Sequence, residues 1–141
     1  MKVLAVSLLI LAVLISLVPQ FTDCRSQGRA LSLADGRSIP MKCHWTARAE
    51  LVVGVPLFAV GATLLFSRRR ETRIALGVLG MILGVFTILL PTALIGVCMS
   101  ADMLCNSAMK PALILMGSLV VAFSLASTVL AVVRGEKGPV A

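Results

Sequence analysis

The chain has 141 residues, of which 59% are hydrophobic and only 13% charged. A soluble domain carries roughly 25% charged residues, and a chain this short has too little interior to bury so much apolar surface. A soluble globular fold is therefore excluded. The net charge of +7 comes from cations that flank apolar segments, so it indicates a lipid bilayer and argues against nucleic acid as a partner.

Four runs contain no charged residue, namely 3–21, 51–67, 74–101 and 111–133. At about 1.5 Å per helical residue, three of them can cross a hydrocarbon core of about 30 Å, and the second can do so if it recruits the preceding turn. We predict transmembrane helices over about 3–21, 47–67, 73–96 and 110–133, with outer loops 22–46 and 97–109. The fold class is then an all-α integral membrane protein, in which residues 1–141 form one domain of two helical hairpins.

Two features bear on the topology. The first helix has an alternative interpretation as a cleaved signal peptide, because Met1 and Lys2 precede an apolar run. Segment 18–23 offers no small-x-small cleavage site, so we expect the helix to be retained. An arginine cluster follows the second helix, and the positive-inside rule then places both termini in the cytoplasm. The predicted topology anchors are Arg68, Arg69, Arg70 and Arg73.

The first outer loop carries a turn signal of its own. Asp35-Gly36 is typical of a type I′ β-hairpin turn, which needs positive φ at both central residues. Leu31, Leu33 and Ile39 flank it with rough alternation. We predict a small β-hairpin over about 30–43, lying across the helix ends, with Thr46 as N-cap of the second helix.

Four cysteines lie in the two polar outer segments, at Cys24, Cys43, Cys98 and Cys105. The chain crosses the bilayer an even number of times between them, so both segments face the same side. In an oxidising compartment the cysteines would cross-link these segments by disulfide bonds. Of the three pairings, Cys24–Cys43 with Cys98–Cys105 makes each hairpin self-contained, and cross-loop pairing stays open.

Two alternatives for these thiols are kept. Thiolate and thioether ligands select Cu(I) and similar soft ions, and imidazole can join them. The candidate metal ligands are Cys43, His44, Cys98, Met99, Met103 and Cys105. Thiol–disulfide exchange is the other alternative, since Lys42 and His44 flank Cys43 and could activate its thiolate. The main interpretation needs no cofactor.

Small residues mark the helix surfaces that approach a neighbour closely. Such residues let backbones pack where lipid removes the hydrophobic drive between helices. They are Gly54 and Gly61 in the second helix, Gly77, Gly80 and Gly84 in the third, and Gly117 in the fourth. Packing within one bundle is the first expectation, and a face for a partner is the alternative.

Three other side chains near the second helix are given ordinary roles. His44 is interpreted as an interfacial polar residue and Trp45 as a membrane-interface anchor. Glu50 is the one acid close to the hydrocarbon, and we assign it a role with the helix dipole near the N-terminus rather than a buried functional role.

The segments Met41-Lys42-Cys43-His44-Trp45-Thr46, Ile95-Gly96-Val97-Cys98-Met99 and Met103-Leu104-Cys105-Asn106 resemble a family of small bacterial four-helix membrane proteins, the domain of unknown function DUF4418. The resemblance covers nearly the whole chain. It implies a bacterial inner or plasma membrane and an accessory role beside an ATP-binding-cassette transporter, and it carries no catalytic residues. We therefore expect a non-enzymatic partner subunit of a larger membrane complex.

Overall fold

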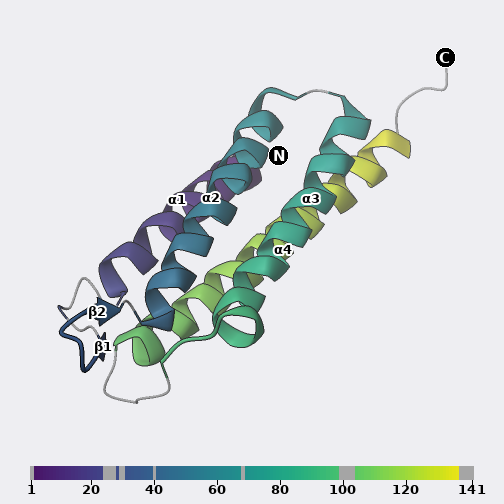
Figure 1. Cartoon of the computed structure of the whole chain (residues 1–141). Coiled ribbons are helices and arrows are strands. Elements are labelled where there is room, and N and C mark those ends of the chain that lie inside the picture. Colours follow the sequence, from purple (N-terminus) through teal and green to yellow (C-terminus); the bar gives the residue numbers. More distant parts are fainter. Residues whose placement is uncertain are drawn as a thin grey trace.

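Four long helices run side by side in alternating directions (Figure 1). The structure is a computed structural model that describes residues 2–23, 28, 31–39, 41–67, 69–98 and 104–136. The helices are α1 (Lys2–Thr22), α2 (Lys42–Phe66), α3 (Arg70–Leu89) and α4 (Lys110–Glu136). Two π-helical turns extend the second pair, η1 (Leu90–Leu94) after α3 and η2 (Cys105–Met109) before α4.

All four helices are long and apolar enough to cross a membrane. The third membrane-spanning segment, Arg70–Leu94, consists of α3 and η1. The fourth, Cys105–Val133, consists of η2 and most of α4. Many large apolar side chains stay exposed along them, such as Val52, Phe66 and Leu115, as expected where lipid is the solvent. The predicted all-α membrane class is confirmed, and the protein is a multi-pass membrane protein.

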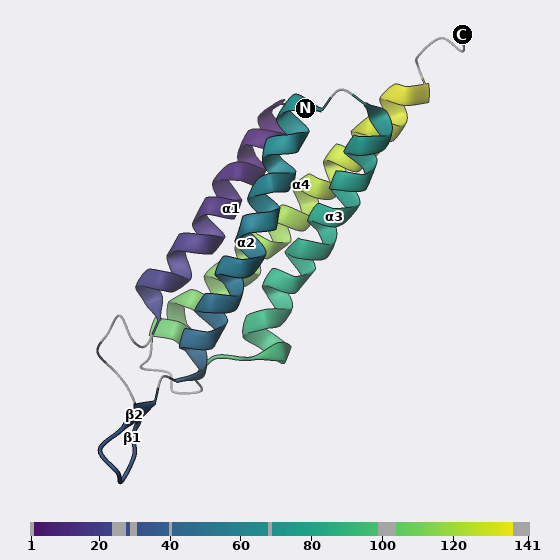
Figure 2. The same cartoon turned by 45° about the horizontal axis from the view of Figure 1, so that its top comes forward.

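The helices pair as two hairpins, α1 with α2 and α3 with α4. The start of α1, the α2–α3 connection and the end of α4 lie at one end of the bundle, and the strands lie at the other (Figures 1 and 2). We call the latter the strand end; it also carries the start of α2 and η1. Both cysteine-bearing segments reach this end, as the even number of crossings requires.

Small residues let α1 approach α2. A Cβ built on Gly54 would lie 2.0 Å from Oγ of Ser16, and one on Gly61 would lie 3.0 Å from Cγ of Leu9. No side chain larger than hydrogen fits at Gly54 without displacing the serine. The first hairpin is thus closed by direct backbone approach.

The second hairpin is built in the same way. Gly77 and Gly80 face hydroxyl-bearing residues of α4, and Gly84 lies opposite Gly117, where a Cβ on either would come within 3.1 Å of the other's carbonyl oxygen. These glycine faces lie inside the bundle between α3 and α4. They are therefore not surfaces on which a partner could dock.

The core fills the space between the two hairpins. Leu8 and Ile15 of α1, Leu57 of α2, and Leu113 and Val120 of α4 are fully buried. These positions recur at helical spacing on one stripe of each helix. The stripe of α2 also includes Cys43, Thr46 and Glu50.

The strand end departs from the predicted helix bounds. α2 begins at Lys42 instead of about 47, with Met41 as N-cap and no side-chain cap bond. Thr46 is therefore inside the helix and not its N-cap. At the end of α3, Pro91 cannot donate a backbone hydrogen bond, and the helix changes there to the π turn η1.

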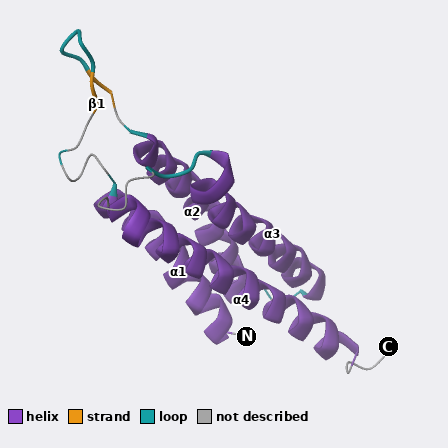
Figure 3. Ribbon diagram, turned by 90° about the horizontal axis from the view of Figure 1, so that it is seen from below, coloured by secondary structure: helices purple, strands orange, loops and turns teal. Residues whose placement is uncertain are grey.

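A short antiparallel strand pair, β1 (Leu31–Ser32) with β2 (Ser38–Ile39), lies in the first outer segment. It projects away from the bundle and does not cover the helix ends as predicted (Figures 2 and 3). The predicted type I′ turn is also wrong: Gly36 has φ of 74° while Asp35 keeps negative φ. The amide of Gly36 donates to the carbonyl of Leu33, and that of Leu33 to Arg37, which fits a three-residue connection ending in a left-handed glycine.

Candidate functional site

Sulfur atoms from both hairpins meet at the strand end. Sγ of Cys43, in the first turn of α2, lies 3.5 Å from Sγ of Cys98, in the segment after η1. The thiol of Cys98 also donates toward Sδ of Met41, at 3.9 Å. We call Met41, Cys43 and Cys98 the sulfur cluster. Its sulfur–sulfur contact is longer than the bond of about 2.05 Å in a disulfide, so it is a contact between two sulfur atoms.

The backbone that carries Cys98 is held by a specific set of bonds. Gly96 has φ of 77°, a left-handed value that favours glycine, and its amide donates to the carbonyl of Leu90. The hydroxyl of Thr46 donates to the carbonyl of Gly96 at 2.7 Å. Thr46 therefore ties the segment after η1 to α2 and brings Cys98 toward Cys43.

Cys105 has a different neighbour. It is fully buried in η2, and its thiol donates to the carbonyl of Thr22, at 3.4 Å, where α1 ends. No disulfide joins Cys98 to Cys105, so this half of the preferred pairing is wrong. The reason is that Cys105 faces the end of α1, whereas Cys98 faces the start of α2. Cys24 lies outside the described residues, and its pairing with Cys43 stays a prediction.

His44 contacts Asp23, the residue that follows α1. Its Nδ1 lies 3.0 Å from Oδ2 of Asp23, and both side chains are largely buried. The ring also packs edge-on against Trp45, with centroids 6.0 Å apart. Trp45 itself is 58% exposed, consistent with an anchor at the membrane interface. The partner of His44 is thus the carboxylate of Asp23 in this chain.

The predicted metal ligands separate into three groups. Cys43 and Cys98 come together, His44 and Cys105 contact other groups, and Met99 and Met103 lie outside the described residues. Within the described ranges, no three histidine, cysteine or acidic side chains are arranged to hold a metal. Sequence reasoning left Met41 out of the ligand set, although its Met-x-Cys spacing was visible.

The arginines at the opposite end bond to helix ends. Nε of Arg73 donates to the carbonyl of Ser67, just after α2, at 2.9 Å. Arg70 donates to the carbonyl of Val132 in α4, at 3.2 Å. Arg69 is exposed, and Arg68 lies outside the described residues. These cations therefore satisfy carbonyls near the C-terminal ends of α2 and α4, where the helix dipoles favour positive charge.

Glu50 is the residue that sequence reasoning placed wrongly. It is fully buried on the interior stripe of α2, where the dipole role near the helix N-terminus does not apply. Neither carboxyl oxygen has a hydrogen-bond partner within the described part of the chain. The missed signal was the start of α2: a helix from Lys42 puts Glu50 in its third turn, on the same face as Cys43 and Thr46.

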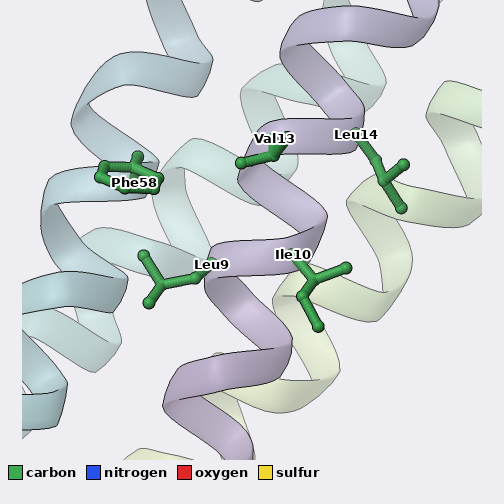
Figure 4. Close-up of a pocket in the computed structure, with 5 residues that line it drawn as sticks. All are labelled: Leu9, Ile10, Val13, Leu14 and Phe58. Carbon is green, nitrogen blue, oxygen red and sulfur yellow. The ribbon is translucent and has the colours of Figure 1, made fainter.

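Two apolar hollows lie on the helix surfaces. One, of about 250 Å³, is lined by Leu9, Ile10, Val13 and Leu14 of α1 and Phe58 of α2 (Figure 4). We call it the Phe58 groove. The other, of about 230 Å³, lies on α3 along 81–86. Only carbon side chains line the Phe58 groove, so it suits an acyl chain or an apolar side chain.

Fold and site together define a small four-helix, multi-pass membrane protein with sulfur atoms gathered at one end. A protein-family model described as "Domain of unknown function (DUF4418)" matches residues 5–130, and the chain belongs to this family. Neither the curated proteins nor the solved structures contain a match to the chain.

Proposed function

We propose that the protein is a non-enzymatic accessory or structural subunit of a larger membrane complex, such as an ATP-binding-cassette transporter. The observation that supports this is the pair of apolar hollows on the lipid-facing surfaces of α1–α2 and α3. Since the glycine faces are used inside the bundle, these hollows are shaped apolar surfaces that a neighbouring transmembrane helix could fill. We place the strand end outside the cell, with both termini in the cytoplasm of a bacterium.

Photo-crosslinking in native membranes tests this role. A photoreactive amino acid is placed at Phe58, in the groove, and as a matched control at Val52, which is 72% exposed on the same helix. We expect a single protein adduct of defined mass at 58, identified by mass spectrometry as a transporter subunit, and only lipid adducts at 52. Lipid adducts at both positions would contradict the accessory role.

A second candidate, thiol chemistry at the strand end, is supported by the 3.5 Å contact between Cys43 and Cys98. As a redox site, the thiolate of Cys98 would attack Sγ of a disulfide-bonded Cys43, form a Cys43–Cys98 disulfide and release the former partner sulfur of Cys43 as a thiolate, with no net oxidation. As a metal site, two thiolates and the thioether of Met41 would offer three soft ligands to Cu(I).

Copper titration separates the two forms of this candidate. In a variant with Cys24 and Cys105 replaced by serine, Cu(I) is added against a competing chelator. One tightly held ion per chain, weakened by Met41→Leu and lost in Cys43→Ser, supports the metal site. No copper above the Cys43→Ser baseline refutes it and leaves the redox pair, which must then oxidise with a small disulfide reagent.

A further inference from the structure

Glu50 is a carboxyl group buried between the two hairpins without a matching donor. It lies eight residues into α2, about 12 Å along the axis from Lys42. The side chain is 0% exposed, and both of its oxygens lack a hydrogen-bond partner within the described part of the chain. An ionised carboxylate at such a place loses its hydration and gains nothing in return.

The polar group that faces Glu50 comes from the other hairpin. The Thr87 side chain of α3 interacts with it and is itself fully buried. The hydroxyl hydrogen of Thr87 is already donated to the carbonyl of Leu83, at 3.1 Å. While it donates to Leu83, the Thr87 hydroxyl offers Glu50 only oxygen lone pairs, and a protonated carboxyl can donate to them. Turned toward Glu50, the same hydroxyl would donate to a carboxylate.

Among the described residues, no charged group is bonded to Glu50. Asp23, directly after α1, contacts His44 of α2. Arg48 of α2 is exposed. Lys42 at the start of α2, Cys98 after η1, Cys105 in η2 and Lys110 in α4 also lie at this end. None of them forms an ion pair or hydrogen bond with Glu50 in the described ranges.

We propose that Glu50 is a proton-binding site, and that the bound proton holds the two hairpins together. The ligand is a single proton, taken up from the water at the strand end. With the proton in place, the neutral carboxyl can turn slightly to donate to Oγ1 of Thr87 and join α2 to α3. When the proton leaves, the carboxylate needs water, so α2 and α3 separate at the strand end.

Unfolding in mixed detergent micelles at a series of pH values tests the proposal. If the folded bundle keeps one proton that the unfolded chain releases, the wild-type folding equilibrium constant falls about tenfold per pH unit as pH rises. In Glu50→Gln the side chain has nearly the same shape as a protonated glutamate, is uncharged at every pH, and can still donate a hydrogen bond to Thr87. We expect it to fold and to lose this one-proton dependence. Glu71→Gln is the matched control, since Glu71 is exposed in the first turn of α3, and it should keep the wild-type profile.

Three outcomes would overturn the proposal. They are parallel pH profiles for wild type and Glu50→Gln, a Glu50→Gln protein that does not fold, and a loss of the dependence in Glu71→Gln. A second measurement uses fluorescent labels on the strand-end segments of α2 and α3 in lipid vesicles. Their separation must increase at high pH in the wild type and stay constant in Glu50→Gln; a constant wild-type separation contradicts the opening step.

Discussion

A disulfide between Cys43 and Cys98 should form readily and lock the two hairpins. The two sulfur atoms are already 3.5 Å apart and 55 residues apart in sequence. Closing a loop of this length stabilises the folded state by about 4 kcal/mol in the chain-entropy model. This is an upper figure, because helices that persist in detergent already restrict the unfolded chain.

The assay uses a variant with Cys24 and Cys105 replaced by serine, oxidised by a small disulfide reagent and unfolded in mixed micelles. We expect an intrachain bond within minutes, a faster-moving band on a non-reducing gel, and a higher free energy of unfolding that reductant reverses. The matched control keeps Cys43 and Cys105 and replaces Cys24 and Cys98. If that control cross-links as fast, the placement of Cys98 beside Cys43 is refuted.

Three further predictions concern packing, backbone and topology. Gly84→Ala should destabilise the bundle by about 1–3 kcal/mol, because the new Cβ would lie 3.1 Å from a backbone oxygen of α4 and 3.0 Å from a valine methyl. Gly80→Ala should destabilise it less, because the new Cβ would meet the Ser124 hydroxyl, which can rotate away. Equal free energies of unfolding for the two variants would contradict this. Gly96→Ala should cost about 1–2 kcal/mol for its left-handed φ and slow oxidation of the Cys43–Cys98 pair; an unchanged oxidation rate would show that this turn does not position the thiol. An impermeant thiol reagent on intact cells should label a cysteine at Leu33 and spare one at Ser67, and the reverse pattern would invert the proposed topology.

The fold class and the helix count could be predicted because they follow from long runs of uncharged residues, a signal that tertiary contacts barely alter. The start of α2 could not, since residues 42–50 are mixed in polarity and become helical by packing against α1 and η1. The contact of Gln20 with the carbonyl of Ala47, at 2.9 Å, is one such tie. The turn at Asp35-Gly36 was misjudged because a glycine at the last loop position serves two turn types equally well.

For the candidate site, the residues and the end of the bundle on which they lie could be predicted, but their contacts could not. That Cys43 and Cys98 share an end follows from counting crossings. That they touch, while Cys105 faces Thr22, depends on the left-handed Gly96 and on the bond from Thr46 to its carbonyl. Those contacts join residues that are 50, 55 and 83 positions apart, and no local pattern encodes them.

The position of Glu50 also has a consequence for biogenesis. The chain is synthesised from its N-terminus, so α1 and α2 can close over Ser16 and Gly54 before α3 has emerged. Until Thr87 arrives with the second pair of helices, the acid on α2 faces acyl chains instead of protein. The unfinished first hairpin therefore exposes a polar group that only docking of the second can shelter, which gives membrane quality control a chemical mark for incomplete assembly.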